Sequence, residues 1–115
     1  MLYKIFTSLP IIVYIKKNSW IAKLAARHLQ KKNMAIVVGS TIYLWNVSKE
    51  NFLQNEKWVK HELAHIKQFE QYGFIRFIFL YLQQTLKRGY EKNKFETEAV
   101  EAENQGHNFK NYQFK

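Results

Sequence analysis

The segment His61-Glu62-Leu63-Ala64-His65 constrains this chain of 115 residues more than any other, because it places three ionisable groups within two helical turns. Asn55 and Gly73 are suitable caps for the two ends of a helix that contains it. On a helical wheel, Glu62 falls inside the apolar face, His65 lies at its edge and His61 lies just beyond it. Buried charge is costly unless it is paired or bound to metal, so this face predicts a polar site.

Two histidines four residues apart on one helix, His61 and His65, can bind a single metal ion. Glu62 is suited to take the proton of a metal-bound water, as in metal-assisted hydrolysis of peptides. The chain has no cysteine, so imidazole and carboxylate groups are its only strong ligands. In an alternative interpretation, both histidines are neutral and hydrogen-bonded, and Glu62 pairs with a lysine at the helix surface.

A catalytic zinc site usually has three protein ligands, so one more is expected from elsewhere in the chain. The candidates lie on a helix that begins near Asn93, and the first of them is Glu96, which falls on the apolar face. Glu98, outside the apolar arc, and Glu103, inside it but two turns further on, come second and third. Asn93 and Glu96 also fit a capping box, in which Glu96 would only stabilise the helix N-terminus.

The length of the chain favours one domain over residues 1–115, and its pattern predicts a mainly helical α+β fold with a small hairpin beside the metal-binding helix. Ala35–Val38 and Thr41–Trp45 are rich in β-branched and aromatic residues and flank Gly39-Ser40, which favours a tight turn. Ser19 and Ser48 are candidate caps for two helices, the first over residues 20–31 and the second a short turn.

The apolar run over residues 5–15 is too short to span a bilayer, and it lacks a clear signal-peptide cleavage site. We therefore expect an extended segment there and, by default, a cytoplasmic protein. The helix predicted over residues 74–87 is apolar around most of its circumference. Core packing is the favoured role of this helix, and contact with a membrane or another chain is the alternative.

Eighteen Lys and Arg residues against nine Asp and Glu give the chain a net charge of +9. Such a charge attracts nucleic acid, anionic membranes or acidic proteins without specifying any of them. The basic residues form no run of five or more, so a solvated surface is favoured over a specific nucleic-acid site.

The HELAH segment, the apolar helix after it and Phe95-Glu-Thr-Glu-Ala99 resemble the gluzincins, and the short chain resembles their smallest members, the minigluzincins. The resemblance covers about residues 35–103. It implies a zinc peptidase in which His61, His65 and Glu96 bind Zn²⁺ and Glu62 is the general base, with the hairpin holding an extended peptide or protein substrate. Many gluzincins have Asp or Asn four residues after the glutamate ligand, where this chain has Val100. The resemblance therefore implies that a hydrogen bond to a ligand histidine is missing.

Three further hypotheses accompany this interpretation. Tyr90 could donate a hydrogen bond to the oxyanion of a tetrahedral intermediate, or it could be an ordinary half-buried tyrosine. The chain could instead be a catalytically silent, zinc-binding basic module that associates with nucleic acid or an anionic membrane. A third possibility is a self-inhibited peptidase whose tail, residues 105–115, lies across the cleft.

Overall fold

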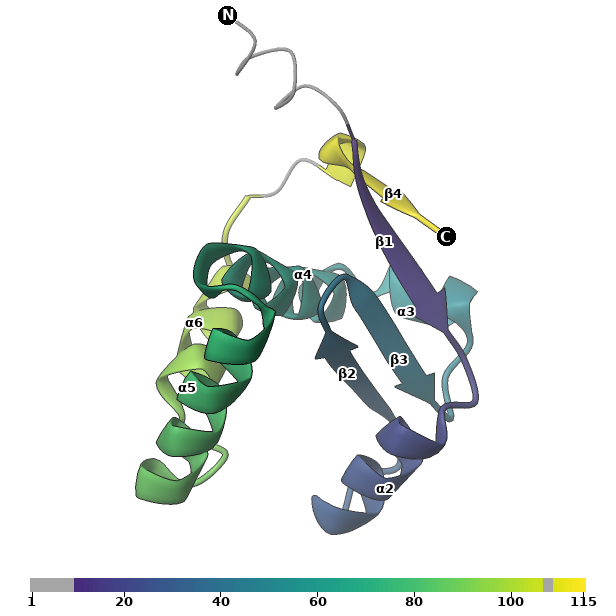
Figure 1. The fold of residues 1–115 in the computed structure, drawn as a ribbon. Helices are drawn as coiled ribbons and strands as arrows, with labels where there is room; N and C mark the ends of the chain where they lie inside the picture. The colour runs from purple at the N-terminus through teal and green to yellow at the C-terminus, as the bar shows by residue number, and fades with distance from the viewer. Residues whose placement is uncertain (1–9, 107–108) are drawn as a thin grey trace, which may run out of the picture.

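A four-stranded sheet and five α-helices make up the part of the chain that the computed structural model describes, residues 10–106 and 109–115. The mainly helical α+β class is confirmed. In chain order, the elements are β1 (Ile11–Lys16), α2 (Trp20–His28), β2 (Met34–Val38), β3 (Thr41–Trp45), α3 (Lys49–Gln54), α4 (Glu56–Tyr72), α5 (Phe74–Arg88), α6 (Lys94–Ala102), the short 3₁₀ helix η1 (Phe109–Asn111) and β4 (Tyr112–Phe114). Figure 1 shows the sheet on one side of the molecule and the pair α5 and α6 on the other.

The sheet has the strand order β2-β3-β1-β4, so β2 lies at one edge and β4 at the other. β2 and β3 form the predicted antiparallel hairpin, with Val38 paired to Thr41 across the two-residue turn. Gly39 has a φ of +66°, a left-handed conformation that glycine adopts without steric cost. β1 runs parallel to β3 and to β4, which brings the last strand beside the first.

One face of the sheet packs against α4. Ile42 and Leu44 are fully buried and belong to the same cluster as Val59, Leu63 and Ile66 of α4, which recur at helical spacing. The helix that carries the HELAH segment is therefore fixed to the sheet by its apolar face.

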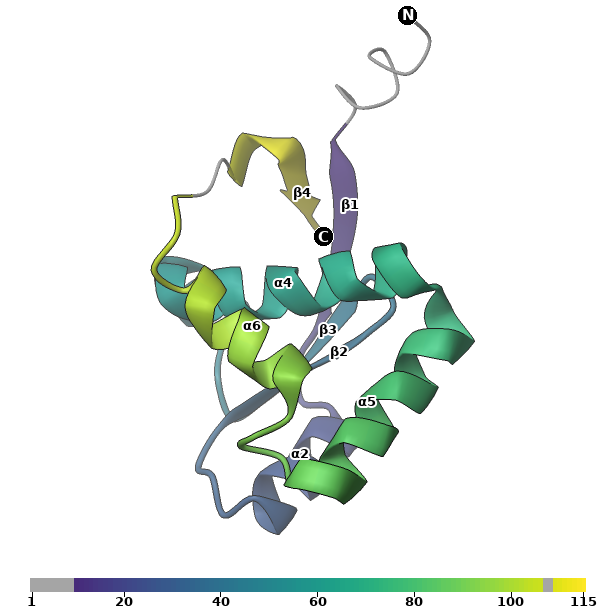
Figure 2. The same cartoon turned by 90° about the vertical axis from the view of Figure 1, so that its left-hand side faces the viewer.

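A second cluster joins the three helices α4, α5 and α6 through the rings of Phe69, Phe77 and Phe95. Gly73, with a φ of +84°, ends α4 and lets α5 turn away from it. Figure 2 shows α6 lying across α4, so two segments about thirty residues apart in sequence meet at the centre of the molecule.

The helix starts agree with the sequence prediction. Ser19, Ser48, Asn55 and Asn93 each accept a hydrogen bond from a backbone N–H of the first helical turn. The helix predicted over residues 20–31 ends earlier, at His28. The predicted extended segment begins as β1 at Ile11, and residues 5–9 lie outside the described residues. In the part that the structure describes, no helix combines the length and apolar character needed to cross a membrane.

Asn93 fixes the start of α6 to α5. Its side chain is fully buried, accepts from the Phe95 N–H, and donates to the Tyr81 carbonyl and the Thr85 hydroxyl. The predicted capping box does not form, because the Asn93 N–H donates to the Tyr90 carbonyl and the Glu96 carboxylate is turned elsewhere. Of the two predicted box residues, only Asn93 therefore caps α6.

We predict that Asn93→Ala lowers the free energy of unfolding by about 2–4 kcal/mol, because it removes a cap and leaves two partly buried acceptors on α5 without this donor. Urea denaturation followed by circular dichroism measures the change. The matched control is Asn55→Ala, which removes only an exposed cap and should cost about 1 kcal/mol. Equal losses in the two variants would contradict the bridging role of Asn93.

Candidate metal centre

The three ionisable residues of the HELAH segment lie on the inner side of α4, as the wheel predicted. Glu62 is 4% exposed and His65 is 7% exposed, whereas Lys67 on the opposite side of the helix is exposed to solvent. Glu62 therefore does not pair with a surface lysine, and that part of the alternative interpretation is wrong. The burial of this carboxylate gives the site a group whose charge is poorly solvated.

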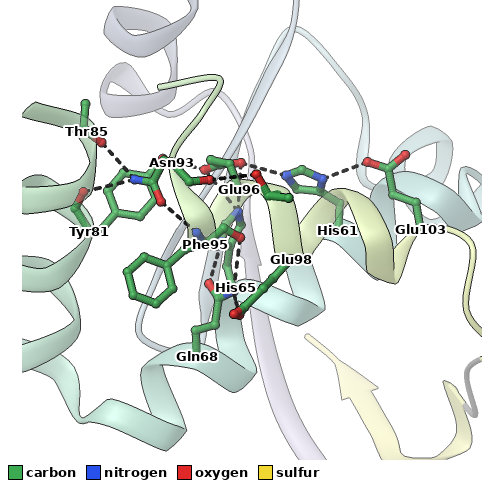
Figure 3. Close-up of polar contacts among 11 residues, drawn as sticks. His61, His65, Gln68, Tyr81, Thr85, Asn93, Phe95, Glu96, Glu98 and Glu103 are labelled. Carbon is green, nitrogen blue, oxygen red and sulfur yellow. Dashed lines mark hydrogen bonds and ion pairs between the residues drawn. The ribbon is translucent and has the colours of Figure 1, made fainter. Parts of the chain in front are cut away.

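Glu96 of α6 points at both histidines (Figure 3). Its Oε1 atom lies 3.1 Å from Nε2 of His61 and 3.3 Å from Nε2 of His65. The three side chains each offer a ligand atom, and these atoms all lie within 4.8 Å of one another, so the group could hold a metal ion. Glu98 and Glu103, the other two candidates for the third ligand, are not part of this group.

Two of the three separations between candidate ligand atoms match a small tetrahedral ion. Ligand atoms about 2.0–2.1 Å from a tetrahedral zinc ion lie about 3.3 Å from one another, close to the two Nε2–Oε1 distances to Glu96, and the whole group lies within 4.8 Å. Two imidazole nitrogens and one carboxylate oxygen are also a donor set that divalent first-row metals accept. Geometry and donor chemistry thus agree.

Both histidines are held through their other ring nitrogen. Nδ1 of His61 lies 2.9 Å from Oε2 of Glu103, and Nδ1 of His65 lies 2.9 Å from Oε1 of Gln68. An oxygen acceptor at Nδ1 favours a proton on that atom, so Nε2 is the nitrogen that would bind a metal ion, after giving up the proton that it shares with Glu96. The ring orientations that a metal site needs are therefore built into the fold.

The expectation that an outer hydrogen bond is missing is wrong. Val100 is half exposed and takes no part in the site, but Glu103 at the end of α6 contacts His61 instead. Gln68 is itself held in place, because its amide donates to the Phe95 carbonyl and to Oε1 of Glu98. Glu98 consequently supports His65 indirectly and is two hydrogen bonds away from it.

Tyr81 of α5 is the fourth residue at Glu96, and the sequence analysis did not identify it. Its hydroxyl donates to Oε2 of Glu96, and its ring lies 6.3 Å from that of His65 between centroids. A buried tyrosine in an otherwise apolar helix needs a hydrogen-bond partner for its hydroxyl group. This requirement was the signal in the sequence that could have identified Tyr81 as a residue of the site. The contact fixes the orientation of the carboxylate relative to the two histidines.

The buried charges change the protonation of the site. Burial raises the pKa of Glu62 to about 7, although both histidines oppose the change. For His61, burial is the largest influence and lowers the pKa, but the hydrogen bond to Glu96 and the nearby carboxylates raise it to about 9. Burial would raise the pKa of Glu96, but the hydrogen bonds from His61, His65 and Tyr81 hold it well below its usual range. Glu96 is therefore ionised, as a metal ligand must be.

The site opens into a cleft of about 680 Å³. One wall is the free edge strand β2, all five residues of which line the cleft, and helices α2, α4 and α5 form the others. Most of the other lining residues are apolar or aromatic: Ala25, Leu29, Trp58, Phe69, Phe77, Ile78, Tyr81, Leu82 and Tyr90. Tyr90 lies near the charged groups, since burial and the charges of Glu96 and Glu62 raise the pKa of its phenol. The cleft can thus hold an extended, apolar ligand beside the carboxylates.

The C-terminal tail does not cover the cleft in the part that the structure describes. Residues 112–114 form β4 and pair with β1, at the sheet edge opposite β2. None of residues 105, 106 or 109–115 lines the cleft. The hypothesis of a tail lying across the site is wrong for these residues, and His107 and Asn108 lie outside the described residues.

Comparisons of the chain with models of protein families, with curated proteins and with solved structures found no match. The chemistry of the site must therefore be argued from its own residues. They combine a group of three residues that could hold a metal ion, a buried carboxylate that is not among them, and a cleft bordered by an edge strand of the sheet.

We predict that Glu96→Ala, Glu103→Ala and Glu98→Ala weaken metal binding in this order. Loss of an outer hydrogen bond costs about 10- to 100-fold in affinity, which we expect for Glu103→Ala, whereas loss of the ligand Glu96 should cost more. Glu98→Ala should cost least, because Gln68 keeps its bond to the Phe95 carbonyl. The three variants have the same net charge, so competitive titration with Zn²⁺ reports their geometry. Equal affinities of the Glu96 and Glu98 variants would exclude Glu96 as a ligand.

Proposed function

We propose that this chain is a zinc-dependent peptidase related in mechanism to the gluzincins. The observation that carries the proposal is the convergence of His61, His65 and Glu96 on one point, with Glu62 buried beside them at the same cleft. The two Nδ1 hydrogen bonds favour zinc ligation through both Nε2 atoms. Zinc is the metal most often found with two histidines and a glutamate when the fourth position is open.

Zinc bound here would act as a Lewis acid, polarising a peptide carbonyl and making a water molecule a stronger acid. Glu62 is the residue that takes the proton of the attacking water and passes it to the amine that leaves. Burial raises the pKa of Glu62 to about 7 in the metal-free site, and a bound zinc ion would lower it, which favours the ionised form that accepts a proton. Tyr90, which lines the cleft, is our candidate for the donor to the carbonyl oxygen as negative charge develops there.

The edge strand β2 supports a peptide as the substrate. An extended chain can add to a free strand edge through backbone hydrogen bonds, and its side chains alternate between the two sides. On one side they would meet the apolar cleft wall formed by Phe69, Phe77 and Leu82. The proposed substrates are therefore extended peptides or unfolded proteins with large apolar side chains near the scissile bond.

We predict that a chelator lowers the melting temperature and that added Zn²⁺ restores it. A ligand that binds only the native state stabilises it by about 2.7 kcal/mol when its free concentration is 100-fold above its Kd. Thermal melts with and without chelator measure the change, and metal analysis of the untreated protein identifies the ion. The Glu96→Ala variant is the control and should respond weakly. Superimposed melts of the wild-type protein with and without zinc would contradict a native-state metal site.

We also predict that Glu62→Gln leaves zinc stoichiometry unchanged and lowers peptide cleavage by about 10²- to 10⁴-fold, since Glu62 is a proton carrier and not a ligand. Cleavage of an unfolded, apolar-rich protein is measured by mass spectrometry. Glu70→Gln, which removes an exposed carboxylate from the same helix, is the matched control and should retain activity. Undiminished cleavage by the Glu62 variant would exclude the mechanism, and zinc binding without cleavage by the wild type would favour the silent interaction module.

A further inference from the structure

Two helices on either side of the cleft leave large apolar side chains in solvent. α2 and the residue after its end contribute Ala25 and Leu29 to the cleft, and α5 contributes Phe77, Ile78, Tyr81 and Leu82. Figures 1 and 2 show both helices projecting from the same end of the molecule, beyond the end of the sheet. The surface at this end is therefore formed by α2 and α5 together, with the mouth of the cleft between them.

The exposed residues of α5 form one stripe. Ile75, Phe79, Leu82 and Leu86 follow each other at spacings of four, three and four residues, which places them within about 60° on a helical wheel. Their exposed fractions run from 55% to 88%, so the stripe is unpartnered along the length of the helix. Such a stripe is far more apolar surface than scattered single residues provide, and it indicates an interaction surface.

The stripe is continuous with the cleft. Leu82 belongs to both, since it lines the cleft and is 55% exposed. α2 has the same arrangement. Its residue Ala25 lines the cleft, and the next apolar positions around the circumference of the helix are Ile21, Leu24 and Trp20, which are all exposed. Each helix thus extends an apolar wall of the cleft outward onto the surface of the protein.

Cations border the apolar residues on both helices. On the helical wheel of α5, one side of the stripe is bordered by Arg76, Gln83 and Lys87. On the wheel of α2, Arg27 and Lys23 lie next to Trp20, on the side away from the cleft. All of these side chains are exposed. The sequence has no Asp or Glu before Glu50 or between Glu70 and Glu91, so neither helix carries a negative charge. Exposed apolar residues on two helices whose only charges are positive are complementary to the headgroups and acyl chains of an anionic lipid layer.

Two other partners fit this surface less well. A second copy of the chain would bring two rims of the same positive charge together across an apolar contact. Nucleic acid would satisfy the cations but would leave the apolar stripe against phosphates and sugars.

We propose that the protein docks on anionic membranes through α2 and α5, with the mouth of the cleft facing the lipid. Only one consequence rests on the proposed function, namely that peptides at the membrane surface are its substrates.

The test uses the full chain and measures co-sedimentation with vesicles of phosphatidylcholine alone or mixed with phosphatidylserine. We expect binding to the mixed vesicles, little binding to phosphatidylcholine alone, and weakening by added salt. Phe79→Gln and Leu86→Gln should each weaken binding by about tenfold, because each removes apolar surface from the contact. Val100→Gln, on an exposed apolar residue of α6, is the matched control and should bind like the wild type.

A second pair tests the charge. Lys87→Gln should weaken binding by about fivefold, as expected for one cation near an anionic surface, and Lys67→Gln on the outer side of α4 should not. The proposal is overturned if the wild type does not bind mixed vesicles, if Val100→Gln weakens binding as much as Leu86→Gln, or if Phe79→Gln dissociates a dimer detected by sedimentation. Vesicle binding involves no turnover, so its failure leaves the proposed peptidase intact, and a failure of cleavage leaves this proposal intact.

Discussion

The carboxylate of Glu96 is the interaction on which the rest of this structure depends. A buried carboxylate is costly unless several donors surround it, and here His61, His65 and Tyr81 supply them. These donors come from α4 and α5, so Glu96 is satisfied only when three helices hold their native positions. The packing that satisfies this one buried carboxylate thus also brings together the group that could hold a metal ion.

Further residues hold the partners of this carboxylate in place. Gln68 and Glu103 fix the two imidazole rings, and Glu98 holds Gln68. Asn93 fixes the start of α6 to α5, which sets the direction in which Glu96 points. Outer groups of this kind commonly matter almost as much as the ligands, because a ring that rotates freely loses its alignment with the ion. The polar network and the helix packing therefore stabilise one another.

Local signals account for what the sequence predicted. The HELAH helix, its buried face, the hairpin turn at Gly39 and the caps Ser19, Ser48, Asn55 and Asn93 all follow from spacing and residue type over a few positions. The choice of Glu96 over Glu98 came from the apolar face of its helix, and the structure brings Glu96 to the histidines. Faces and caps are properties of single elements, and a sequence contains them directly.

What was not predicted depends on how elements pack. Tyr81 reaches Glu96 only because α5 turns at Gly73 and returns beside α6, and nothing within α5 indicates that path. Glu103 replaces the partner expected at the position of Val100 because it lies on the side of α6 that faces His61. The tail was misplaced for a similar reason, since parallel pairing of β4 with β1 joins segments about a hundred residues apart. Pairing at such separations has no short-range signal.

The free edge of β2 has one more consequence, which concerns aggregation. Its sequence, Met-Ala-Ile-Val-Val, is uncharged and rich in β-branched residues, a composition that favours edge-to-edge pairing between molecules. The opposite edge strand, β4, has only three residues and offers a poor template. β2 is longer, but all five of its residues line the cleft. The helices on either side of the cleft would prevent the edge of a second, flat sheet from reaching it. The recess proposed to bind a single extended chain would therefore also protect the protein from fibril-like association with itself.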